Sequence, residues 1–193
     1  MATRRVPTFQ TIVSPALLDR ALGQIADKLQ TDLSWLDRGF GLAQKLVTVD
    51  GTRPVIYEEN GIDHFPLHPN ENLGNFCYFE RTEESSVFWE YNRYRSKFGR
   101  DLVGLVVWGN LKTIYAADWQ QRTREHVRGE VMNVLTESGF SFTKSIELKQ
   151  FWYEGKNIYR NHTIKEVDSQ YLMRPYVGFR IDIEIIYNNE NRC

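Results

Sequence analysis

The run LVGLVVW at residues 102–108 decides the fold of this chain. Its seven residues carry no charge, are rich in valine and are followed by Gly109-Asn110. A run of this kind is typical of a strand that is buried on both faces of its sheet. We therefore expect residues 102–108 to form the central strand, around which the other elements are arranged.

A helix is predicted shortly after this strand. Asp118 can accept hydrogen bonds from the free backbone N–H groups of a first turn, and Gln121 can reach back as in a capping box. Gly139 can take the left-handed conformation that ends many helices. The predicted helix spans residues 119–137, and its apolar residues recur on one face of a 3.6-residue period: Val127, Val131, Val134 and Leu135.

A second helix is predicted near the start of the chain. Ser14 is a suitable N-cap, and Pro15 suits the first helical position. Residues 15–30 then carry a broad apolar stripe with polar residues on the opposite side. Residues 1–13 are polar and basic, and we expect a flexible arm that is ordered only when a partner holds it. The predicted organisation is an arm at 1–13 and a single domain at 14–193.

Most other segments favour β-structure. The runs at 46–49 and 55–57, with Asp50-Gly51 between them, predict a hairpin. Residues 59–75 predict a long irregular loop, which in a compact domain is usually functional or an interface. Further strands are predicted at 76–79, 87–91, 93–98, 145–153 and 177–187.

The last of these strands shows the clearest alternation. Its odd-numbered residues are apolar, and its even-numbered residues include Arg180, Asp182 and Glu184. The pattern indicates one buried face and one largely charged face. The order of helix, strands, helix and closing strands predicts an α+β fold, with an antiparallel or mixed β-sheet and both helices, N-terminal and central, packed on one face.

Composition argues against several classes of protein. The 193 residues can bury a core without a metal or disulfide staple. Lys and Arg number 24 against 25 Asp and Glu, a balance that disfavours a general nucleic-acid binder. Two cysteines, Cys77 and Cys193, are too few for a disulfide framework and indicate a reduced, intracellular protein. No apolar run approaches the roughly 20 residues that span a bilayer, so no membrane partner is expected.

Catalytic motifs are absent from the sequence. It has no G-x-S-x-G, no glycine-rich phosphate loop and no cysteine beside a histidine. His64 and His68, with Asp63, are the only clustered metal-ligand types, but Pro66 argues against the helix that would bring both rings together. We expect no enzyme, no metal and no cofactor. The alternative is a small ligand-binding or hydrolytic domain that uses the loop with His64 and His68.

Basic residues alternate with aromatic residues at 93–98. In a strand, Arg93, Arg95 and Lys97 share one face, and Arg100 lies beyond them. Such a strip can contact a nucleic-acid backbone or an acidic partner. It can also be the solvated side of an antiparallel strand, and the balanced net charge favours that interpretation.

The order of these elements resembles that of tail-terminator and related neck or tail-completion proteins of tailed bacteriophages. The resemblance rests on the N-terminal amphipathic helix, the uncharged strand that ends at Trp108, the helix after it and the closing run RIDIEIIY at 180–187. It is one of element order over roughly residues 15–187, without a diagnostic motif. The run PYVGFRID at 175–182 also resembles the end of structural proteins of Bacteroidetes phages and prophages.

The resemblance implies a structural virion protein that is assembled in the host cytoplasm. It implies a homo-oligomeric ring, expected to be a hexamer, that caps the tail tube protein and joins it to the head-tail connector or stopper protein. DNA would pass through the ring without specific binding. A baseplate or head-completion component is the alternative among virion proteins.

The residue expectations come from the chain itself, because the resemblance supplies no pattern of residues to transfer. Subunit or partner contacts are expected at one set of residues: Thr8, Phe9, Asn60, Asp63, His64, His68 and Asn70. A surface that faces the channel or an acidic partner is expected at a second set: Arg93, Arg95, Lys97 and Arg100.

Overall fold

The computed structural model describes residues 17–49, 51–58, 62–69, 72–82, 86–90, 96–137, 139–162 and 172–188. Within these residues no helix is long and apolar enough to cross a membrane. The elements follow one another as α1 (Leu17–Asp32), β1 (Arg38–Leu42), β2 (Gln44–Thr48), β3 (Gly51–Tyr57), β4 (His64–Pro66), β5 (Phe76–Arg81), β6 (Ser86–Glu90), β7 (Ser96–Asn110), α2 (Leu111–Tyr115), η1 (Ala116–Gln121), α3 (Arg124–Glu137), β8 (Thr143–Trp152), α4 (Gly155–Ile158) and β9 (Tyr176–Asn188).

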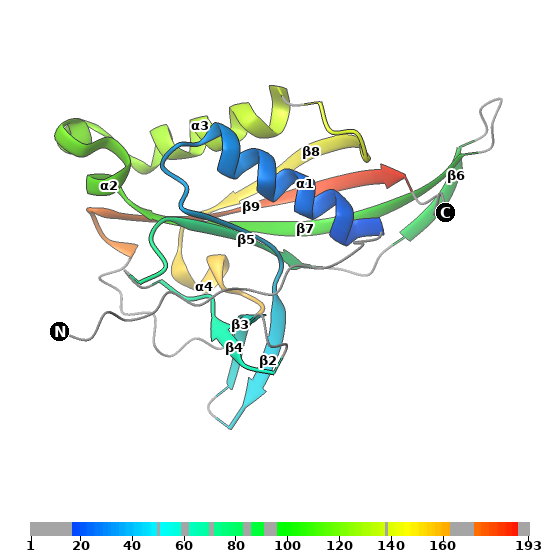
Figure 1. Cartoon of the computed structure of the whole chain (residues 1–193), viewed down its shortest axis with the longest axis horizontal. Helices are drawn as coiled ribbons and strands as arrows, with labels where there is room; N and C mark the ends of the chain where they lie inside the picture. Colours follow the sequence, from blue (N-terminus) through cyan, green and yellow to red (C-terminus); the bar gives the residue numbers. More distant parts are fainter. Residues whose placement is uncertain are drawn as a thin grey trace.

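A six-stranded mixed sheet is the main layer of the molecule (Figure 1). Its order is β1-β5-β7-β9-β8, and β6 pairs with the first part of β7, beyond the end of β5. Only the pair of β1 with β5 is parallel. β7 pairs with β9 from Phe98 opposite Asn188 to Asn110 opposite Tyr176. The predicted central strand at residues 102–108 is therefore confirmed.

Helices α1 and α3 cover one face of this sheet (Figure 1). The apolar stripe of α1, which includes Leu22 and Ile25, packs into one buried cluster with Val131 of α3. The odd-numbered residues of β7 and β9, such as Val103 and Ile183, complete that cluster. Each buried side chain of this size contributes about 1.5–3 kcal/mol. The predicted α+β fold, with both helices packed on one face, is confirmed.

A second buried cluster lies on the opposite face of the sheet. Tyr78 of β5 and two residues of β7, Val106 and Trp108, pack there with Leu67 and Ile158. The small antiparallel sheet β2-β3-β4 and the short helix α4 lie on this side of the molecule (Figure 1). β7 is thus buried on both faces, as its uninterrupted apolar run predicts.

The segment around the small sheet partly matches the prediction. β2 and β3 form the predicted hairpin, in which Thr48 pairs with Gly51, and Gly51 has the positive φ of 130° that glycine tolerates. The region predicted as an irregular loop contains β4, which pairs with β3 and places His64 opposite Tyr57. A strand of three residues ending in proline is too short to give a recognisable alternation.

The prediction that the central helix starts at Asp118 is wrong. Asp118 lies in η1, and the extended backbone of Arg122 separates η1 from α3. Thr123 occupies the position before α3, where its backbone N–H donates to Nδ1 of His126 at 3.2 Å. The break arises because Thr123 and His126 make a local helix start of their own, which competes with the capping box at Asp118.

Candidate functional site

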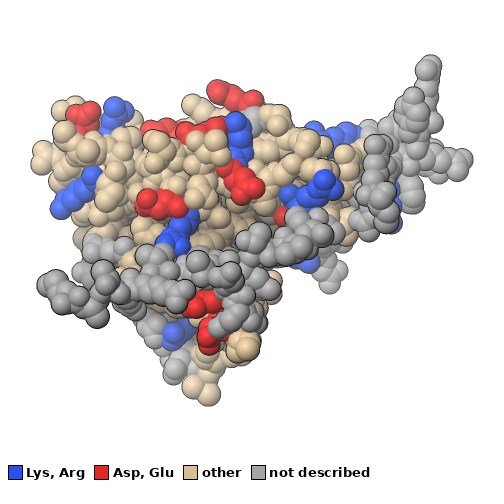
Figure 2. Space-filling view, in the orientation of Figure 1, with Lys and Arg blue, Asp and Glu red and all other residues tan. Residues whose placement is uncertain are grey.

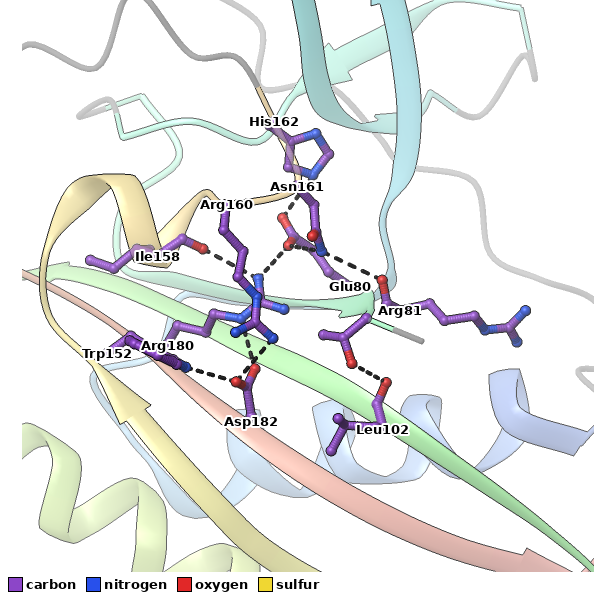
Figure 3. Close-up of polar contacts among 11 residues, drawn as sticks. Glu80, Arg81, Leu102, Trp152, Ile158, Arg160, Asn161, His162, Arg180 and Asp182 are labelled. Atoms are coloured by element: carbon purple, nitrogen blue, oxygen red, sulfur yellow. Dashed lines mark hydrogen bonds and ion pairs between the residues drawn. The ribbon is translucent and has the colours of Figure 1, made fainter. Parts of the chain in front are cut away.

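The charged face of β9 is buried at its centre. Arg180 is 0% exposed, and Asp182 two residues later is 4% exposed. The alternation of β9 indicated a charged face, but here that face is covered by α4 and the residues that follow it (Figure 3). Because ionised side chains are costly to bury without partners, a buried charged cluster of this kind is a candidate functional site.

A glycine makes room for Arg180 in the middle of the sheet. Gly104 of β7 pairs with Glu80 of β5 on one side and with Asp182 of β9 on the other. A Cβ atom at Gly104 would lie 2.1 Å from Nη2 of Arg180, so the guanidinium occupies the space that a side chain would fill. Glycine within a strand often marks such a close approach.

Arg180 bridges the two carboxylates on either side of Gly104. Its Nη1 lies 2.5 Å from Oε2 of Glu80, and its Nε donates to Oδ1 of Asp182 at 2.9 Å. Nη1 also donates to the carbonyl oxygen of Ile158 at 3.3 Å, which ties the end of α4 to the network. Charge-assisted bonds of this kind are roughly twice as strong as neutral ones.

Asp182 has two further partners from outside the strand pair. Nε1 of Trp152, the last residue of β8, donates to Oδ2 of Asp182 at 2.7 Å. Nη2 of Arg160 lies 3.0 Å from the same oxygen, and its guanidinium carbon is 5.5 Å from the centroid of the Trp152 ring. Both oxygens of this carboxylate are therefore engaged.

Glu80 is held by the residues that follow α4. Nε2 of His162 lies 2.8 Å from Oε1 of Glu80, an ion pair when the imidazole is protonated. Nδ2 of Asn161 donates to Oε2 at 3.2 Å (Figure 3). Burial alone would raise the pKa of Glu80, but the hydrogen bonds and positive charges of His162 and Arg180 together outweigh burial and lower it.

Two tyrosines, Tyr78 and Tyr159, lie close to Glu80 of this network. Burial and the negative charge of Glu80 raise the pKa of Tyr78 and of Tyr159, so both stay neutral. Among the described residues, the phenolic oxygen of Tyr159 has no hydrogen-bond partner. These rings form the border between the ion network and the second apolar cluster.

The geometry of this network is typical of a structural ion-pair network and not of a reactive centre. Each carboxylate already has several partners, and Arg180, Glu80 and Asp182 are buried. A ligand that reached them would have to break a buried ion pair, which costs about 3–5 kcal/mol. The network holds residues 152–162 against the main sheet.

Three of the predicted loop residues lie in β4 or beside it. Asp63 and His64 are exposed, and His68 lies half-buried beyond the end of β4. In the part of the chain that the structure describes, no three His, Cys, Asp or Glu residues are grouped to hold a metal. The other predicted contact residues lie outside the described residues: Thr8, Phe9, Asn60 and Asn70.

The structure describes two of the four residues of the predicted basic strip, Lys97 and Arg100. Arg93 and Arg95 lie outside the described residues. Lys97 and Arg100 are three positions apart on β7, so their side chains point to opposite faces of the strand. Arg100 lies 3.9 Å from a carboxylate oxygen of Glu184 and therefore belongs to a mixed charged surface.

Among the residues that the structure describes, two surfaces are candidates for contact with another protein. The hairpin of β2 and β3 projects from the body of the molecule (Figure 1), and it carries Val47 at 72% exposure and a fully exposed Val49. The second surface is the outer edge of β8, the last strand of the main sheet. On the face drawn in Figure 2, acidic and basic side chains are interspersed over the body, without a large field of one sign among the coloured residues.

The ion network could not have been found from motif searches. Its signals were Gly104 inside an otherwise bulky strand and the Arg180-Ile181-Asp182 spacing that places two opposite charges on one face. No protein-family model and no curated protein matches this chain.

Proposed function

We propose that this chain is a structural subunit that assembles with copies of itself into a closed ring, of the tail-terminator or neck type in a tailed phage. In this role the ring caps the tail tube and joins it to the head connector. The subunit turns over no substrate, and its function lies in its contacts. A hexamer is the expected ring.

The open edge of β8 is the observation that carries this proposal. β8 spans ten residues and, among the described residues, pairs only with β9. An unpaired strand edge offers backbone donors and acceptors to any added strand. Lys144, Glu147 and Lys149 are exposed along it, and charges on an edge restrict which strands can pair there.

The two sides of the main sheet end in different strands. β8 forms one side, and β1 with β6 forms the other. Unlike surfaces on opposite sides of a subunit favour head-to-tail contact between copies, which closes into a ring when the rotation between neighbours closes. An isologous dimer would instead join identical surfaces.

The projecting hairpin supports a second kind of contact. Val47, Val49 and Ile62 are exposed apolar residues of the β2–β4 region. Val47 and Val49 lie beside the turn of the hairpin, whereas Ile62 lies near the opposite end of β3. Exposed apolar residues at the tip of a projection favour binding to another protein. In the proposed assembly this region contacts the tail tube or the head connector. The phage context itself rests on the resemblance in element order, and flanking genes for a tail tube, tape measure or portal would support it.

Light scattering coupled to size-exclusion chromatography, with electron microscopy of the peak, tests the ring. We expect one species of fixed copy number over a wide range of protein concentration. Ser145→Lys combined with Gln150→Lys adds charge to exposed positions of β8 and should shift the protein toward monomer. Asn133→Lys, an exposed change on α3, is the matched control and should leave the ring intact. A strict monomer at every concentration would count against the proposal.

A further inference from the structure

The start of α1 lies beside the start of β8. Nε2 of Gln24 donates to Oγ of Ser141 at 2.8 Å, and its Oε1 accepts from the backbone N–H of Phe142 at 3.2 Å. The guanidinium carbon of Arg20 lies 3.1 Å from the centroid of the Phe142 ring. Residues 141 and 142 directly precede β8. The first turns of α1 therefore lie near the first residue of β8.

α1 and β8 run in the same direction along the sheet. β8 begins opposite Tyr187 of β9 and ends opposite Arg180. The chain just after α1 lies near Tyr176, at the other end of β9. Asn75 joins the two places, because it bonds both to the carbonyl oxygen of Trp35 and to the backbone N–H of Asn110, and Asn110 pairs with Tyr176. A strand that preceded Leu17 could lie along its own β8 only by reversing completely within residues 14–16. A strand supplied by a neighbouring copy needs no such reversal.

The residues before this point have the composition of a strand. Residues 8–13 read TFQTIV, a run of aromatic, β-branched and polar residues without charge. Such residues are enriched in β-strands. In an extended conformation Phe9 and Val13 share one face. Because the run is uncharged, it can lie beside Lys144 and Lys149 without repulsion.

The inner face of β8 offers a matching surface. Ile146, Leu148 and Phe151 are only half-buried and pack at the border of the helix-side cluster. An added strand with apolar residues on the same face would complete their burial. Main-chain hydrogen bonds would supply affinity, and the alternate side chains would supply specificity.

We propose that residues 8–13 of one copy add as an edge strand to β8 of the next copy. The inference rests on the proposed assembly and deepens it, since it names the segment and the surface that link neighbours. Each copy then gives an arm and receives an arm, which is a head-to-tail contact.

Photo-cross-linking tests this contact in the full-length chain. Phe9 is replaced by the photoreactive analogue benzoylphenylalanine, and the assembly state is measured by light scattering before irradiation. We expect cross-linked dimers and higher multimers on a denaturing gel, with the arm joined to the tryptic peptide of residues 145–149. The same probe at Val47 is the control and should give no cross-link to that peptide.

The outcomes separate this inference from the proposed function. A multimer that gives no cross-link, or cross-links elsewhere, overturns the arm contact and leaves the ring standing. A cross-link to residues 145–149 that stays in the monomer band shows that each copy covers its own β8, which also overturns the inference. A protein that is monomeric before irradiation contradicts the ring and the arm contact together.

Discussion

The guanidinium of Arg180 lies over the backbone of Gly104, so closely that an added Cβ atom would come within 2.1 Å of Nη2. Arg180 cannot move aside without breaking its bonds to Glu80 and Asp182. The central strand therefore tolerates only glycine at this position.

Gly104→Ala should destabilise the protein by about 3–5 kcal/mol, the cost of disrupting a buried ion pair. Chemical denaturation followed by circular dichroism measures the change. Gly23→Ala in α1 is the matched control, since no atom lies within 4 Å of a Cβ built there. Because alanine is the better helix former, the control should gain about 0.5–1 kcal/mol. Equal effects of the two changes would refute the close packing of Arg180 on Gly104.

The stability of the fold should fall in acid through Glu80. The pKa of Glu80 is lower in the folded protein than its ordinary value, so the unfolded chain binds the proton more tightly. The contribution of Glu80 is fully present above that ordinary value and is lost as the pH falls through the lowered pKa. Denaturation midpoints measured from about pH 6 to about pH 3 should fall less steeply in Glu80→Gln than in the parent protein.

An exposed glutamate supplies the comparison for this titration. Glu137 lies at the end of α3 and is exposed. Glu137→Gln should retain the acid dependence of the parent. If Glu80→Gln and Glu137→Gln behave alike, the ion network does not contribute to the acid response.

Cys77 should be unreactive in the folded protein. The side chain is buried in the helix-side cluster, and burial raises the pKa of its thiol to about 12. The thiolate is the reactive form, so a thiol reagent at about pH 8 should modify Cys77 only after unfolding. The experiment uses a Cys193→Ser background, so that Cys77 is the sole thiol. Rapid modification under native conditions would contradict the burial of this strand.

Asn75 should be needed for the connection between α1 and the sheet. Its Nδ2 donates to the carbonyl oxygen of Trp35 at 2.8 Å, and its Oδ1 accepts from the backbone N–H of Asn110 at 2.8 Å. Asn75→Ala leaves both backbone groups without this partner and should cost about 2–4 kcal/mol in unfolding free energy. Asn133→Ala on the exposed side of α3 should change stability by less than about 0.5 kcal/mol.

Local patterns predicted much of this fold. The uncharged run at residues 102–108, the apolar stripe at 15–30 and the alternation at 177–187 each carry their own period, and all three elements are present. The Asp50-Gly51 pair likewise predicted the hairpin of β2 and β3. These features depend on neighbouring residues only.

The features that sequence reasoning missed depend on distant residues. Arg180 and Asp182 are buried because Trp152 and residues 158–162 lie over them, and no local pattern predicted an element at residues 158–162. α3 starts later than predicted because Thr123 bonds to His126, a local contact that competes with the predicted cap at Asp118. The open edge of β8 could not be seen before the strand order was known.

The position of β7 between β5 and β9 has a consequence for the growing chain. On the ribosome, the uncharged run at 102–108 emerges long before residues 176–188, which supply its longest neighbour. Contacts between such distant segments form slowly, and unpaired apolar strands attract chaperones or aggregate. Synthesis halted before residue 176 should therefore yield an insoluble product. The emergence of β9 from the ribosome is the step that allows the nascent polypeptide to complete its native sheet.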